Sequence, residues 1–277
     1  MTFLLTGVPR AGTTLCCNIL NNQKVFLALH EPINPSKLIP DTRTPAYLQI
    51  KDKVLEIKKS ISLGLPIELG DAKQGLAVNN PVGLNVDAAT GKRKLQAVRG
   101  SVLLKQYIGK NVQLVIKQNA LFTALLTELR REFPIVCVVR NPVDVLLSWW
   151  TISLPVSRGR LPAGEQNSAL LASRLRGLDE LNRQFTIYEW FCESYEPYRQ
   201  NTVRYEDIII TNGQALVEKF NITSPSLSEL AYQERHFPED VLHKLRAAQN
   251  HITSMNTFGF YTKQEITDRL QQVLSQQ

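Results

Sequence analysis

Apolar and polar residues follow one another along this chain in two alternating patterns. Short apolar or β-branched runs, typical of strands, occupy residues 3–6, 25–29, 112–116, 135–139 and 202–205. Apolar residues at intervals of three and four predict helices over residues 13–22, 45–60, 120–132, 142–152, 168–198, 213–220, 238–251 and 263–275. Because strands and helices alternate, we expect an α/β fold with a parallel sheet and right-handed crossovers.

One long segment departs from both patterns. Residues 63–100 are rich in glycine, asparagine, aspartate and proline, and they lack a steady apolar period. We interpret this segment as loops with short elements that form a substrate-facing insert. Single α/β domains reach the length of this chain, 277 residues, and we predict one domain over residues 1–277.

Composition narrows the class of protein only slightly. The chain has 32 Lys and Arg against 25 Asp and Glu, and this net charge of +7 suits nucleotides, nucleic acid or acidic surfaces, or serves solubility alone. The apolar runs are much shorter than the ~20 residues that cross a bilayer, and the N-terminus lacks a basic signal region. We therefore predict a cytoplasmic protein without a transmembrane segment. The four cysteines lack disulfide or zinc spacing, which predicts free thiols, buried or half-buried.

A glycine-rich loop follows the first predicted strand. Residues 7–14 read GVPRAGTT, which is the spacing of the phosphate-binding loop of nucleoside triphosphatases, but Thr13 stands in the lysine position and Thr14 in the Ser/Thr position. Glycines allow successive amides to converge on an anion, and the following helix adds partial positive charge. Arg10 lies inside the loop and can supply the missing full charge. The alternative interpretation is an ordinary turn between a strand and a helix.

The residues that follow the two best buried strands are cations. Lys117 and Arg140 stand where a metal-dependent kinase or GTPase would carry an aspartate for Mg²⁺. Among the strands, acids follow only at Tyr205-Glu206-Asp207. The sequence therefore predicts that phosphate or sulfate is bound by cations rather than through a metal.

A second motif begins at Arg140. This arginine precedes a helix with Asn141 as its predicted N-cap, and Ser148 lies eight residues further on. Ligands of parallel sheets bind beyond the carboxyl ends of the strands, where an arginine can hold a phosphate bidentately and a serine can add a hydroxyl donor. The alternatives are an ion pair of Arg140 with Asp144 and a Ser148 hydroxyl bonded to its own helix.

Together the two motifs resemble the cofactor signature of the sulfotransferases that use 3′-phosphoadenosine-5′-phosphosulfate (PAPS). Residues 9–14 match the family form Pro-Arg-Ser-Gly-Thr-Thr, with Ala11 in place of the serine, and Arg140 with Ser148 matches the second element. The likeness covers residues 3–32 and 112–208 and is nearest to the tyrosylprotein sulfotransferases and the broad bacterial group. It implies a three-layer sandwich around a central, mainly parallel sheet, as in P-loop nucleoside triphosphatases.

The resemblance also implies roles for individual residues. Glu31 matches the catalytic base, for which burial should raise the pKa, and Lys117 with Arg10 would stabilise the transition state; His30 is the rival base. The residues expected to bind PAPS are Arg10, Ala11, Gly12, Thr13, Thr14, Arg140, Ser148 and Tyr205. Asn119 replaces the catalytic histidine of the cytosolic enzymes, and their C-terminal Arg-Lys-Gly loop is missing, with residues 256–261 as its candidate replacement.

The predicted reaction is in-line transfer of a sulfuryl group from PAPS to a hydroxyl, releasing adenosine 3′,5′-bisphosphate (PAP), without a metal. The acceptor is left open between a small molecule, a lipid, a sugar and a peptide, and residues 63–100 and 151–175 are its expected walls. Two alternatives remain: a metal-dependent P-loop kinase of small molecules, and a non-catalytic nucleotide- or nucleic-acid-binding module. The basic residues are dispersed along the chain, which argues against nucleic acid as the ligand. The sequence does not indicate which oligomeric state the protein adopts.

Overall fold

A five-stranded parallel sheet forms the centre of the molecule. The computed structural model describes residues 1–38, 44–76, 82–87, 91–232 and 235–275. The strand order is β10-β8-β1-β7-β2, and every neighbouring pair runs parallel. The strands are β1 (Thr2–Gly7), β2 (Phe26–His30), β7 (Gln113–Lys117), β8 (Ile135–Val139) and β10 (Thr202–Arg204). The α/β fold with a parallel sheet is confirmed.

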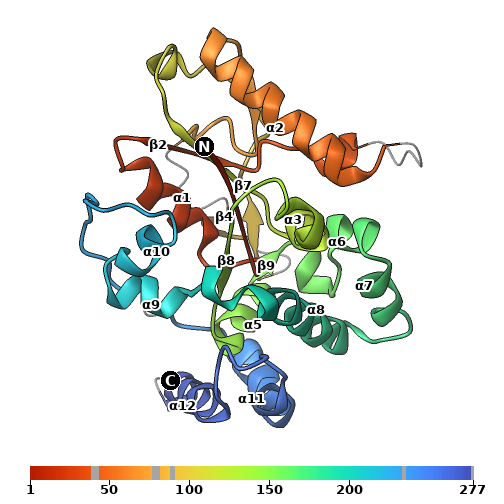
Figure 1. The fold of residues 1–277 in the computed structure, drawn as a ribbon. Helices are drawn as coiled ribbons and strands as arrows, with labels where there is room; N and C mark the ends of the chain where they lie inside the picture. Colours follow the sequence, from red (N-terminus) through yellow and green to blue (C-terminus); the bar gives the residue numbers. More distant parts are fainter. Residues whose placement is uncertain (39–43, 77–81, 88–90, 233–234, 276–277) are drawn as a thin grey trace.

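Helices cover both faces of this sheet. Figure 1 shows α1, α9 and α10 on one side and α3, α6, α7 and α8 on the other, with α11 and α12 packed against α5. The helices are α1 (Thr13–Asn21), α2 (Ala46–Leu63), α3 (Ala120–Ala124), α4 (Leu126–Leu129), α5 (Pro142–Trp150), α6 (Pro162–Asn167), α7 (Ala169–Arg174), α8 (Glu180–Tyr195), α9 (Tyr205–Ile210), α10 (Gln214–Glu218), α11 (Glu239–Ser254) and α12 (Lys263–Ser275). The three layers expected from the resemblance are therefore present.

Short elements fill the two segments that lack a clear sequence pattern. Strands β3 (Ile67–Leu69) and β6 (Gly100–Val102) pair antiparallel, and β5 (Arg93–Leu95) lies between β4 (Val82–Val86) and β9 (Ile152–Ser153). Short 3-10 helices occur at η1 (Pro35–Lys37), η2 (Lys105–Tyr107), η3 (Pro155–Arg158) and η4 (Glu196–Asn201), the last of which is kinked at Tyr198. The parallel pairing of β5 with β9 brings the segment 63–100 next to the segment 151–175. Within the first segment, residues 77–81 and 88–90 lie outside the described residues.

The periodicity of apolar residues predicted two long helices, and both predictions are wrong. The segment 168–198 divides into α7 and α8, because Gly177 takes a left-handed conformation with φ of +77° and Asp179 caps the second helix through the amide of Asn182. The segment 120–132 divides into α3 and α4 at Leu125, whose φ of −117° is not helical. Apolar spacing continued across both breaks, so it could not reveal them.

The core lies between the sheet and its helices. Every residue of β8 and of β2 is buried, as a strand covered on both faces requires. All four cysteines are buried and free, which confirms the prediction. Within the described part of the chain, no helix combines the length and the apolar character needed to span a bilayer.

Candidate active site

The carboxyl ends of the five strands meet at one edge of the sheet and carry most of the predicted site residues. Following the strand order, this edge presents Tyr205 after β10, Arg140 after β8, the loop of residues 7–14 after β1, Lys117 at the end of β7, and Glu31 after β2. The four single residues and, from the loop, residues 9, 10 and 12–14 line a cavity of about 820 Å³. The topology of a parallel sheet therefore brings together residues that lie far apart in the sequence.

The glycine-rich loop leads into the N-terminus of α1. Gly12 precedes Thr13, the first helical residue, with φ of +90°, and Arg10 has φ of +75°, which is unusual for a residue with a side chain. The first amides of a helix have no carbonyl partner within it, so those from Thr13 onward are available to an anion. The amide of Ala11 instead donates to the carbonyl of Val8 at 2.9 Å, and Ala11 is fully buried.

Tyr205 lies directly against this loop. A Cβ atom added to Gly12 would lie 2.4 Å from Cδ2 of the Tyr205 ring, so only glycine permits this contact. The guanidinium carbon of Arg140 lies 4.2 Å from the centre of the same ring, in cation–π geometry. Tyr205 thus connects the loop to Arg140, and all three line the cavity.

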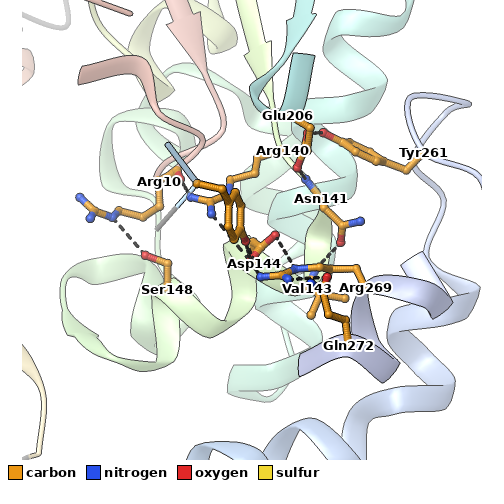
Figure 2. A network of polar contacts seen from close by, with 11 residues as sticks. Arg10, Arg140, Asn141, Val143, Asp144, Ser148, Glu206, Tyr261, Arg269 and Gln272 are labelled. Carbon is orange, nitrogen blue, oxygen red and sulfur yellow. Dashed lines mark hydrogen bonds and ion pairs between the residues drawn. The ribbon is translucent and has the colours of Figure 1, made fainter. Parts of the chain in front are cut away.

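Arg10 and Arg140 occupy the same end of the cavity. Nε of Arg10 donates to the hydroxyl of Ser148 at 3.2 Å, and Arg140 Nη1 donates to the carbonyl of Arg10 at 3.4 Å (Figure 2). Ser148 is 2% exposed and, like Ala11, is not among the residues that line the cavity. The predicted binding residues therefore converge, with Ser148 covered by the Arg10 side chain.

Arg140 also makes the ion pair that the sequence left as an alternative. Its Nη2 lies 3.7 Å from Oδ1 of Asp144, whereas Arg269 Nη2 lies 2.7 Å from that oxygen. Tyr232 donates a further bond to Asp144 at 2.9 Å. Burial would lower the pKa of Arg140, but the Asp144 carboxylate, together with Tyr205, Tyr232 and Glu206, raises the pKa overall. The ion pair is long and buried, and Arg140 Nε has no partner within the described residues, so the guanidinium retains capacity for an anion.

Two further arginines lie near Arg10 and Arg140: Arg235, which the sequence did not single out, and Arg93, which belongs to the strand β5 and not to a solvated loop as the basic run 91–94 suggested. Arg235 lines the cavity from the stretch before α11, and Arg93 of β5 donates to the Thr151 hydroxyl at 3.2 Å. Burial, with the charges of Arg235, Arg93 and Arg140, lowers the pKa of Arg10 to about 10. We call Arg10, Arg140 and Arg235, which all line the cavity, the arginine cluster; Arg93 lies near them but does not line the cavity. Like charges crowd at this end of the cavity, as expected for a site that binds a polyanion.

A second polar group lies where β7 and β2 end. Lys117 Nζ lies 2.5 Å from Glu31 Oε1 and 3.3 Å from His30 Nε2, and the Thr14 hydroxyl lies 3.2 Å from the same histidine nitrogen. The Lys117 side chain is 4% exposed, whereas that of Glu31 is 36% exposed and opens onto the cavity. Glu31 has φ of +50°, a strained conformation that tends to occur at functional sites.

The electrostatics of this group correct one expectation. Burial alone would raise the pKa of Glu31, but the positive charge of Lys117 lowers it to about 2. The expected upward shift is therefore wrong for this state of the protein. Burial, helped by Lys117, lowers the pKa of His30 to about 3, so the imidazole is neutral at pH 7. Its Nδ1 has no partner within the described residues.

The acidic segment after β10 and the C-terminal segment have structural roles. Glu206 accepts the Asn141 amide at 3.0 Å and the Tyr261 hydroxyl at 2.6 Å, which ties the start of α5 to both (Figure 2). None of residues 256–261, all of them described, lines the cavity; residues 229–231 and Arg235 line it instead. The segment 256–261 therefore does not replace the missing C-terminal cofactor loop.

Part of the cavity lining is apolar. Its side chains come from the end of β5 with the stretch that follows it, and from the chain that runs from β9 into the start of α6. We call this set the apolar wall: Leu95, Ala97, Leu154, Pro155, Val156, Leu161, Pro162 and Ala163. Both segments expected to contact the acceptor therefore contribute to the cavity.

Comparison with known proteins identifies the family of this chain. The model of the sulfotransferase family matches residues 3–216. The chain belongs to the sulfotransferase family. Among solved structures, a sulfotransferase from Alicyclobacillus acidocaldarius aligns with 11% identity and a TM-score of 0.43, covering 91% of this chain and 92% of that one. No curated protein matches in sequence.

Proposed function

We propose that this sulfotransferase moves the sulfuryl group of PAPS to a hydroxyl acceptor and releases PAP. The observation that carries the proposal is the single cavity that joins the arginine cluster to the Lys117–Glu31 pair. One end supplies three cations, Arg10, Arg140 and Arg235, for a ligand with two separated phosphate groups. The other end supplies a carboxylate for the acceptor hydroxyl and a cation for the charge that develops in the reaction.

The residues present fit the donor. The amides at the start of α1 and the Arg10 guanidinium suit the 5′-phosphosulfate, and the partly unpaired Arg140 suits the 3′-phosphate. Arg235 faces the same end and adds a further cation for the phosphates. Tyr205 would hold Arg140 in place through its ring rather than bind the donor through its hydroxyl.

The chemistry assigned to the acceptor end is a single displacement. Glu31 accepts the proton of the acceptor hydroxyl while the acceptor oxygen forms its bond to sulfur. The bond between sulfur and the bridging oxygen breaks, and the electron pair leaves with PAP, where Lys117 and Arg10 stabilise the charge. A phosphosulfate that draws Lys117 away from Glu31 would raise the pKa of the carboxylate at the stage when a base is needed.

A thermal-shift comparison tests the cofactor class. We expect PAP to raise the melting temperature and ADP with Mg²⁺ to leave it unchanged, because the arginine cluster selects two separated phosphates. The reverse result would favour the kinase alternative and overturn the proposal. Turnover of PAPS that continues in EDTA would support a metal-independent reaction, and loss of turnover would contradict it. The four free thiols support a reducing, cytoplasmic location as part of the same proposal.

A further inference from the structure

The apolar wall points to the class of acceptor, an inference that rests on the proposed function. We propose that the acceptor is an uncharged alcohol or phenol with an apolar body. Its hydroxyl would lie at Glu31 and its body along the apolar wall. A sugar, a charged peptide or an acidic compound would have to lose water on a surface that returns few hydrogen bonds.

The apolar wall is continuous and open to the cavity. In the parallel pairing of β5 with β9, Arg93 lies opposite Ile152 and Lys94 lies opposite Ser153. The next residues of the two strands, Leu95 and Leu154, therefore lie side by side. Leu95 is 51% exposed although it is a large apolar residue, because its side chain faces the cavity instead of the core. An exposed apolar surface inside a pocket marks a place that an apolar ligand covers.

The far side of the wall reaches the reacting end. Helix α6 packs on α3, which places Leu161, Pro162 and Ala163 beside Ala120 and Leu121, directly after Asn119. All five residues line the cavity. The wall therefore leads from the β5–β9 pairing to the Lys117–Glu31 pair, long enough to accompany an extended or ring-shaped body.

Two polar atoms without partners lie at the reacting end. Within the described residues, Oε1 of Gln118 and Oδ1 of Asn119 are buried and accept no hydrogen bond, and both side chains belong to residues that line the cavity. Gln118 is 4% exposed and fixed by a bond from its Nε2 to the Ile33 carbonyl at 3.0 Å. Both residues directly follow Lys117 in the chain, at the end of the cavity where the acceptor reacts.

Two of the cations that line the cavity near the wall, Arg160 and Arg99, are already engaged. Nε of Arg160 donates to both carboxylate oxygens of Glu165, at 3.0 and 2.9 Å. Arg99 donates to the main-chain oxygens of Glu31 at 2.8 Å and Pro32 at 3.5 Å, so its guanidinium serves to hold the turn that carries Glu31. Neither arrangement requires a charge on the acceptor.

A series of acceptors that share one reacting hydroxyl tests the class. With PAPS as donor, we expect kcat/KM to rise about fourfold with each methylene from 4-ethylphenol to 4-butylphenol, and likewise from 1-butanol to 1-octanol. N-acetyltyrosine amide, 4-hydroxyphenylbutanoate and glucose should react at least tenfold more slowly than 4-butylphenol. A preference for the carboxylate compound, which would indicate recognition by Arg99, or for the sugar or the amide, would overturn the inference.

A matched pair of variants connects the preference to the wall. Leu95→Ser should lower kcat/KM for 4-butylphenol at least tenfold and, because it adds no charge near the arginines, leave the affinity for PAP unchanged. Leu65 is also 51% exposed but does not line the cavity, so Leu65→Ser should change neither. Equal activity of the Leu95 and Leu65 variants would contradict the inference.

Binding of PAP, measured alongside, separates the two proposals. If PAP binds and PAPS is consumed with glucose or the tyrosine amide in preference to 4-butylphenol, the acceptor class is wrong and the proposed function stands. If PAP does not bind, the proposed function fails and the acceptor class fails with it.

Discussion

The Lys117 ammonium lies 2.5 Å from the Glu31 carboxylate, between neighbouring parallel strands. The amide of Glu31 also donates to the Lys117 carbonyl at 2.9 Å, so main chain and side chains fix the pair together. The candidate base and the candidate transition-state cation therefore neutralise each other before any ligand binds. A donor that competes for Lys117 would release the carboxylate, which couples donor binding to activation of the acceptor.

Replacing Glu31 by glutamine tests the base directly. Glu31→Gln keeps the shape of the side chain but cannot take a proton, so turnover of PAPS should fall by about 10²–10⁴-fold while PAP still binds. Steady-state rates and thermal shifts with PAP measure the two effects. Glu68→Gln is the control, since it also removes a carboxylate paired with a lysine, at an exposed site. Retained turnover in Glu31→Gln would exclude Glu31 as the base.

Replacing Lys117 tests the coupling through pH. In the free wild-type enzyme the acid limb of kcat/KM from Glu31 should lie near its pKa of about 2, below the range in which rates are measured. Lys117→Gln removes the positive charge, so burial should raise the pKa of Glu31 and move the acid limb upward, above the ordinary value for glutamate. The rate should also fall by about 10²–10³-fold. Lys117→Arg, which keeps the charge, should show no such limb.

Some of this site followed from the sequence because it depends on single motifs. The loop of residues 7–14, Lys117 and Arg140 each follow a strand with a clear apolar pattern, and parallel strands bring their carboxyl ends to one edge. Arg235 was missed because it lies in a stretch without periodicity, and its side chain reaches the cavity only in the folded chain.

The direction of the shift in the Glu31 pKa could not be predicted from the sequence, for a related reason. It depends on the register of β2 against β7, which sets His30 opposite Lys117 and brings the lysine to Glu31. The spacing of residues along the chain does not show which residues of two neighbouring strands lie opposite each other. The breaks at Leu125 and Gly177 were missed because apolar spacing describes which face is buried and not where the backbone turns.

Removing Arg140 tests recognition of the 3′-phosphate. Arg140→Ala should weaken PAP binding about 10- to 100-fold and leave binding of adenosine 5′-monophosphate nearly unchanged, because a hydrogen bond to a charged group contributes about 1.5–3 kcal/mol. Asp144 keeps its pairing with Arg269, so the variant leaves no unpaired buried carboxylate. Arg235→Ala should weaken PAP binding in the same direction. Equal losses for both nucleotides would contradict the assignment of Arg140.

The buried histidine predicts how stability depends on pH. The folded protein holds the pKa of His30 at about 3, whereas unfolded histidine titrates near 6.5, so the unfolded state binds more protons between these values. Stability should therefore fall as pH falls below about 6.5, by roughly 2 kcal/mol at pH 5 from this residue. His30→Gln should flatten the pH dependence of urea unfolding over that range. The exposed His236, changed to Gln, should retain the wild-type slope.

The contact between Gly12 and Tyr205 predicts that a larger residue at position 12 lowers the free energy of unfolding for two separate reasons. Gly12→Ala places a side chain at φ of +90° and a Cβ 2.4 Å from the tyrosine ring, so both backbone strain and a clash should lower stability and PAP affinity. Gly75 has φ of +61° with open space around it, so Gly75→Ala should show the strain alone, about 1–2 kcal/mol in urea unfolding. Gly12→Ala should cost more than this, and combining it with Tyr205→Ala should recover part of the difference. If Gly12→Ala costs no more than Gly75→Ala and PAP affinity is unchanged, the Tyr205 ring does not hold the loop in the geometry that binds the donor.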